Sequence, residues 1–170
     1  MSVLEKDRNK SNKLNFDVVV KAYELRLVFT TLLFRDFGVQ DKNDVVRRKY
    51  KVHIDDLYPY DDMELYINVA RDKILKLVSD LSTNVTAANS IYPTNFAECD
   101  LRRQYQNLAI TNCFSIITEL QYISTVFRVD INKYTVYTDL LNAEIDRIKG
   151  WRKSDNKIRK KIEKQIKSAA

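Results

Sequence analysis

An apolar repeat between residues 61 and 90 limits most strongly what this chain can fold into. Its apolar residues are separated by steps of three and four positions, whereas a half-buried strand would alternate with a period of two. The seam consists of Met63, Ile67, Ala70, Ile74, Leu77, Leu81, Val85 and Ala88. The spacing predicts one long helix that buries a continuous stripe, with Asp61 or Asp62 as its N-terminal cap.

The whole chain is poor in residues that turn a backbone. Only two glycines and two prolines occur in 170 residues, where average usage gives about twelve and about eight. Phosphate-binding loops and many-stranded sheets depend on such residues, so Rossmann, P-loop, sandwich and barrel folds are disfavoured. An apolar fraction of 45% is enough to build a core. We therefore expect an all-α protein.

Three further helices are predicted from the spacing of apolar residues. The first covers 15–38, with an apolar stripe at Phe16, Val20, Tyr23, Leu27, Thr31 and Phe34 and a stop at Gly38. The third covers about 95–128, with a buried side at Leu101, Tyr105, Leu108, Ala109, Cys113, Ile116, Leu120, Ile123 and Phe127. The fourth begins after the cap Asp130, with an apolar side at Ile131, Tyr134, Tyr137, Leu141, Ile145, Ile148 and Trp151.

These helices predict an antiparallel up-down four-helix bundle with a basic C-terminal tail. We expect a flexible leader over 1–14, the bundle over 15–153 and the tail over 154–170. Residues 39–60 have weak periodicity and are predicted as a long connection of unassigned role. The first helix is apolar beyond one stripe, which suits a chain that has both an internal core and a subunit interface. A homo-oligomer is therefore expected.

The composition excludes several kinds of chemistry. His53 is the only histidine, so multi-histidine metal sites are impossible. Cys99 and Cys113 are predicted to lie on one helix about 21 Å apart, too far for a disulfide. No run approaches the roughly eighteen apolar residues of a membrane span, and no signal-peptide pattern opens the chain. We expect a cytoplasmic protein with no membrane segment, no metal site, no cofactor and no catalytic residues.

Positive charge is concentrated at the C-terminal end. Residues 147–170 contain ten Lys or Arg against Asp155 and Glu163, whereas residues 1–146 carry nineteen basic and twenty-one acidic side chains. Clustered cations release counterions from a phosphate backbone, so nucleic acid is the favoured partner. The residues predicted to contact phosphate are Arg147, Lys149, Arg152, Lys153, Arg159, Lys160 and Lys161, with Arg102 and Arg103 as secondary candidates. An anionic membrane surface, an acidic protein groove and a merely solubilising terminus remain alternatives.

One pattern points to an enzyme instead. Arg48 and His53 enclose four residues, a separation similar to that of the Arg and His pair in helical ribonucleases of the HEPN class. Such a pair could stabilise and protonate a cleaved RNA phosphate. The alternatives to a nucleic-acid-binding module are therefore a HEPN-like ribonuclease using Arg48 and His53, and a plain protein-interaction bundle. The ten tyrosines favour packing over base stacking, because most fall near apolar stripes.

The stretch from Tyr134 to Ser154 resembles the last helix of a known family of four-helix bundles. A tyrosine, a Leu-Leu pair, an isoleucine and an arginine are followed by glycine, tryptophan, basic residues and serine. The matching residues are Tyr137, Leu140, Leu141, Ile145, Arg147, Gly150, Trp151, Lys153 and Ser154. Upstream, Ala88-Asn89, Arg102 and Leu108-Ala109 are similar to the middle of the same family. The family is the Avd-type accessory variability determinants of diversity-generating retroelements, which are related to ribosomal RNA intervening-sequence proteins.

The resemblance implies a non-catalytic, nucleic-acid-binding accessory protein. Such proteins assemble as a homopentameric ring, bind the retroelement's reverse transcriptase and template RNA, and support mutagenic cDNA synthesis. RNA, and DNA as a second polyanion, are thus the nucleic acids expected to bind. This chain departs from the family pattern in one glycine before the tryptophan instead of two, in a longer 38–60 segment, and in its appended basic tail.

Overall fold

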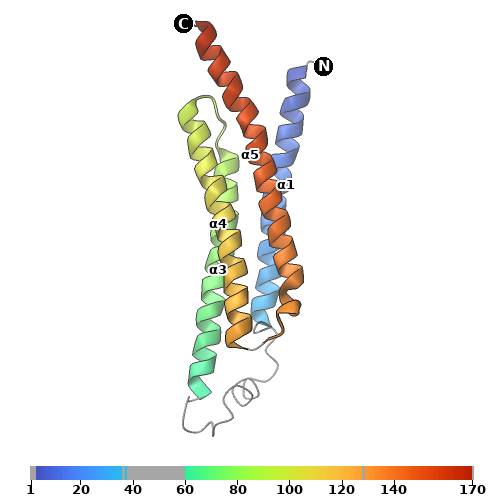
Figure 1. The fold of residues 1–170 in the computed structure, drawn as a ribbon, viewed down its shortest axis with the longest axis vertical. Coiled ribbons are helices and arrows are strands. Elements are labelled where there is room, and N and C mark those ends of the chain that lie inside the picture. Colours follow the sequence, from blue (N-terminus) through green and yellow to red (C-terminus); the bar gives the residue numbers. More distant parts are fainter. Residues whose placement is uncertain (1–2, 36, 38–59, 128, 170) are drawn as a thin grey trace.

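Every element that the computed structural model describes in this chain is a helix. The described residues are 3–35, 37, 60–127 and 129–169, and for 3–16, 60–64 and 169 the description covers the backbone alone. The elements are α1 (Val3–Phe34), α3 (Tyr60–Ser90), α4 (Phe96–Val126), a single 3-10 turn η3 (Ile131–Tyr134) and α5 (Thr135–Ala169) (Figure 1). Because no strand occurs among these residues, the all-α prediction is confirmed.

The four long helices contact one another in a closed order. α1 packs against α3 and α5, and α4 packs against the same two helices. Each contains 31 to 35 residues, which corresponds to about 46–53 Å of helix. Figure 1 shows their long axes side by side, with both chain termini at the same end of the molecule. No described helix contains a stretch long and apolar enough to cross a membrane.

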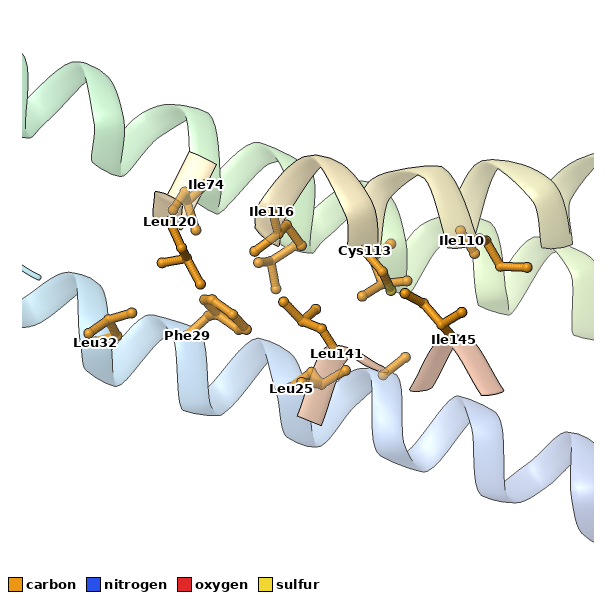
Figure 2. Close-up of a cluster of buried hydrophobic side chains, with 14 of the residues drawn as sticks. Leu25, Phe29, Leu32, Ile74, Ile110, Cys113, Ile116, Leu120, Leu141 and Ile145 are labelled. Carbon is orange, nitrogen blue, oxygen red and sulfur yellow. The ribbon is translucent and has the colours of Figure 1, made fainter. Parts of the chain in front are cut away.

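All four helices contribute to one apolar core. Figure 2 shows side chains of α1, α3, α4 and α5 converging on a shared interior, among them Phe29, Ile74, Leu120 and Leu141. The predicted seam of α3 is confirmed from Ile67 onward: its described members are buried or half-buried. Cys113 is buried in this core and Cys99 is half-buried, and both are free thiols as predicted.

The face of α1 that enters the core differs from the prediction. Tyr23, Leu27 and Phe34 of the predicted stripe are 58%, 52% and 83% exposed. The buried residues come instead from the parallel line Val18, Ala22, Leu25, Phe29, Leu32 and Leu33. Both lines have helical spacing, so periodicity alone could not separate them. The interior line fits because Phe29 packs against Tyr137 of α5, with ring centroids 5.5 Å apart.

The buried side of α4 also differs near its start. Leu101 and Leu108, predicted to be buried, are 45% and 42% exposed. Arg102 and Gln106 face inward in their place, at 3% and 1% exposure. From Ala109 to Phe127 the predicted buried side is confirmed. The inward-facing residues of α4 are therefore polar near its start and apolar from Ala109 onward, and the polar ones form a polar region between α4 and α5.

The predicted N-terminal caps differ from those observed: α3 begins at Tyr60, so Asp61 and Asp62 lie inside the helix and not at its cap. The side chain of Asn95 accepts the backbone N–H of Glu98 at 3.0 Å, and the carboxylate of Glu98 accepts the backbone N–H of Thr94 at 2.6 Å. The pair is similar to a capping box, although Glu98 bonds to Thr94 and not to the cap residue Asn95 itself, and it begins α4 close to the predicted start at about 95. Asp130 accepts the backbone N–H of Asn132 at 3.0 Å, so it caps η3 and not α5 directly.

The first helix ends earlier than predicted. α1 stops at Phe34, and Phe37 is the described residue with positive φ, 58°. The predicted stop at Gly38 lies outside the described residues. A left-handed backbone is strained for a phenylalanine. The side chain of Phe37 is buried, and its carbonyl accepts the Tyr134 hydroxyl at 2.8 Å, so packing and a hydrogen bond hold this conformation.

Helical backbone extends into both segments predicted to flank the bundle. α1 begins at Val3, within the predicted leader of 1–14, where Leu, Glu, Lys and Arg are good helix formers. α5 continues without a break past position 154 to Ala169. Ile162, in the predicted tail, is 7% exposed. The basic C-terminal residues are thus part of a 35-residue helix.

Candidate nucleic-acid interface

A buried polar cluster joins α4 to α5 at the base of the basic segment. The guanidinium of Arg102 lies 3.3 Å from the carboxylate of Asp155 through its Nε, and 4.8 Å from the centroid of the Trp151 ring. Gln106 donates through Nε2 to the same carboxylate oxygen at 2.7 Å. Trp151 is fully buried. We call Arg102, Gln106, Trp151 and Asp155 the polar clasp.

Burial opposes the charges of the clasp. It lowers the pKa of Arg102, and it raises the pKa of Asp155 although Arg102 and Gln106 act in the opposite direction. Both pKa shifts favour the neutral forms, so the loss of hydration on burial exceeds the attraction between the two charges, as is usual for buried ion pairs. Arg102, a secondary candidate for phosphate contact, is therefore an interior residue. The carboxylate of Asp155 pairs with the guanidinium of Arg102, and the ring of Trp151 packs against the plane of the same guanidinium.

Two further predicted phosphate contacts tie the surfaces of α4 and α5 together. Arg103 donates to the side-chain oxygen of Asn156 at 2.5 Å. Arg159 forms an ion pair with Asp100, and its guanidinium lies 5.2 Å from the centroid of the Phe96 ring. The bond to Asp100 raises the pKa of Arg159. Both arginines are half-buried, and each already has a protein partner.

Arg147 bridges α5 and α1. Its guanidinium lies 3.3 Å from Glu144 and 3.6 Å from Asp17. Glu144 is fully buried, and burial raises its pKa to about 7. One of its carboxylate oxygens, Oε1, has no hydrogen-bond partner. Arg147 is thus paired with a buried carboxylate, whose pKa it lowers against the effect of burial.

The exposed cations of α5 form a single row. At 100° per residue, six lysines separated by steps of four and three fall within about 80° of the helix circumference and cover about 27 Å. They are Lys149, Lys153, Lys157, Lys160, Lys164 and Lys167, and all six are exposed. We call them the lysine row. Trp151, Asp155 and Ile162 lie on the opposite side of the helix, facing the rest of the protein.

Most of the lysine row is not engaged in ion pairs. Among the six lysines of the row, two form an ion pair within 4 Å of a described carboxylate over residues 17–35, 65–127 and 129–168: Lys149 with Asp146 at 3.8 Å, and Lys167 with Glu163 at 2.7 Å. Both pairs link neighbours on the same exposed helix surface, where such pairs are weak. The row therefore presents its charge to solvent.

The sequence prediction identified half of this row. Lys149, Lys153 and Lys160 were expected contacts, whereas Lys157, Lys164 and Lys167 were not. The signal that finds them is spacing, because steps of three and four place all six on one helix face. Of the other candidates, Lys161 is exposed on the flank of the row and Arg152 is half-buried. Arg48 and His53 lie outside the described residues.

Gly150 lies in α5 next to Lys149, where it is exposed. Nothing lies within 4 Å of the position that a Cβ would occupy. Glycine is less favourable than alanine in a helix interior, so we expect Gly150→Ala to raise the free energy of unfolding by about 0.5–1 kcal/mol. Urea denaturation followed by circular dichroism measures this change. A loss of stability would contradict the open space around this position.

The described side chains contain no group of three or more His, Cys, Asp or Glu arranged to hold a metal ion. Comparisons of the chain with protein-family models, with curated proteins and with solved structures find no match.

Proposed function

We propose that this protein is a non-catalytic module that binds nucleic acid through the lysine row. The observation that carries the proposal is the row itself: six exposed cations on one face of α5, directed away from the core. A linear array of lysines neutralises successive phosphates and releases their counterions. RNA is the expected ligand, and DNA is a second polyanion that the same row would bind.

The experiment is a charge-neutralising variant of the row. We expect Lys153→Gln, Lys157→Gln, Lys160→Gln and Lys164→Gln together to weaken RNA binding about tenfold or more, and to reduce the slope of log affinity against log salt by about 3. Fluorescence anisotropy at several salt concentrations measures both. Substitution is preferable to truncation after Ser154, which would also remove Asp155 and leave Arg102 unpaired.

The matched control removes the same charge elsewhere. Lys21, Lys73, Lys76 and Lys133 lie on the described surface of α1, α3 and η3. Changing these four to glutamine alters the net charge equally, and we expect it to weaken binding far less than the row variant does. Equal losses in the two variants would show that net charge, and not the row, attracts nucleic acid. Binding to anionic vesicles and no binding to RNA would favour the membrane alternative.

We further propose that this module serves a reverse transcriptase as an accessory protein of a diversity-generating retroelement, binding the enzyme and its template RNA as a homo-oligomer, a pentamer by resemblance. The residues from Tyr134 to Ser154 that resemble the Avd family support this role. We expect the native complex to contain a reverse transcriptase and RNA. Purified protein that cleaves RNA only while His53 is intact would overturn the non-catalytic assignment.

We propose an antiparallel up-and-down arrangement of the four helices in a cytoplasmic protein. Short connections favour antiparallel neighbours, and α3 is joined to α4 by residues 91–95 only. The contacts of α1 with both α3 and α5 support the same order. The exposed apolar residues Tyr23, Leu27 and Phe34 of α1 provide a surface for the proposed self-association.

A further inference from the structure

The segment of α5 that carries most of the lysine row has no aromatic side chain on which a base could stack. No Phe, Trp or Tyr occurs from Arg152 to Ala170. The last aromatic residue of α5, Trp151, is fully buried and lies under the guanidinium of Arg102. Each lysine of the row presents an ammonium group, which contacts phosphate as a point charge.

Proteins that prefer single strands combine a basic groove with aromatic side chains. Stacking of a base on an aromatic ring contributes about 1–3 kcal/mol, and it requires bases that are free of a partner strand. A surface without rings gains nothing from unpaired bases. Its affinity depends on how many phosphates it meets along its length.

A double helix offers this surface a denser line of phosphates. Duplex DNA carries one charge per about 1.7 Å of axis, which is twice the density of each strand alone. Double-stranded RNA is likewise recognised through shape and backbone contacts. The lysine row is straight over about 27 Å because it lies on one continuous helix, so it matches a stiff duplex better than a flexible single strand.

We infer that the lysine row binds the phosphate backbone of double-helical nucleic acid in preference to single strands, without preference for base sequence. The inference rests on the proposed function and names the class of ligand for the same site. The continuity of α5 and the absence of aromatic residues in its basic half carry it.

The experiment compares one RNA duplex of about 20 base pairs with each of its separated strands, with strands chosen to form no structure of their own. We expect the wild-type protein to bind the duplex at least about fivefold more tightly than either strand at the same salt concentration, with a steeper salt dependence. A second duplex of scrambled sequence should bind equally well. The variant with four lysines of the row changed to glutamine should lose most of the difference between duplex and strand.

Two outcomes separate failure of this inference from failure of the proposed function. If single strands bind as tightly as the duplex, and the lysine variant weakens both, the preference for duplex is wrong and the row remains the nucleic-acid site. If the lysine variant binds every RNA as the wild type does, the proposed function itself is wrong.

A tyrosine variant tests the stacking alternative directly. Tyr92, next to the start of α4, is 64% exposed and is an available platform for a base. We expect Tyr92→Ala to leave duplex and single-strand binding unchanged. A loss of single-strand binding of about tenfold in this variant would show that stacking contributes, and it would overturn recognition by phosphates alone.

Discussion

Replacing Asp155 with alanine is expected to lower the free energy of unfolding by about 3–5 kcal/mol, the usual effect of leaving one partner of a buried ion pair without its counterion. Arg102 would keep its charge at a position that is 3% exposed. Gln106 would lose its acceptor at the same time. Urea denaturation of the purified protein measures the change.

Two controls separate burial from charge. Asp100 pairs with Arg159 on the surface, where its side chain is 59% exposed, so Asp100→Ala should cost less than about 1 kcal/mol. Changing the two charged residues of the clasp together, Arg102→Met with Asp155→Leu, should restore much of the stability lost in the single variant, because no buried charge is left unpaired. If Asp155→Ala is as mild as Asp100→Ala, the clasp does not hold α5 to α4.

Glu144 is expected to make the stability of the protein fall as the pH rises. Burial raises its pKa from an ordinary value of 4.5 to about 7, against the opposing effect of Arg147. Between these values the folded protein binds more protons than the unfolded chain does, so the free energy of unfolding decreases with pH. The contribution of Glu144 is complete below pH 4.5 and is lost by about pH 7. It amounts to about 3 kcal/mol.

The variant Glu144→Gln keeps the shape of this side chain and removes its titration. We expect it to have nearly wild-type stability at about pH 5, and to be more stable than the wild type by up to about 3 kcal/mol at about pH 8. Asp146→Asn is the matched control, since Asp146 is two residues away with its side chain 79% exposed. The charged groups around Glu144 are Asp17, Lys21 and Arg147, and its own charge helps to raise the pKa of Cys113 in α4. Parallel pH profiles of stability for the wild type and Glu144→Gln would contradict the role of this carboxyl group.

The existence of the helices was predictable because their apolar spacing is long and regular. The seam of α3 and the interior of α4 from Ala109 onward follow directly from periodicity. The buried face of α1 was not predictable, since two apolar lines of equal spacing run along it and only the neighbouring helices decide between them. The start of α4 was predicted at about 95, but its cap was not, although the spacing of Asn95 and Glu98 is typical of a capping box.

The candidate site was harder to predict, because the number of basic residues in a segment does not show which of their side chains face solvent and which face the protein. Arg102 and Arg103 were predicted to contact phosphate because they are cations. In the structure, Arg102 pairs with Asp155 of α5, and Arg103 donates a hydrogen bond to Asn156 of the same helix. Asp155 and Glu144 could have been noticed by position: each lies three or four residues from apolar members of the buried stripe of α5, Trp151 and Leu141. A charged residue at such a position signals a buried partner.

The continuity of α5 determines how much order is lost when a ligand binds. A disordered basic tail would have to give up backbone freedom, about 1–2 kcal/mol for each residue that becomes fixed. In this chain the residues that carry the lysine row are already helical, and Asp155 anchors them to α4. In the proposed complex with nucleic acid, binding then restricts only the lysine side chains, so we expect a small number of phosphate contacts to suffice for measurable affinity.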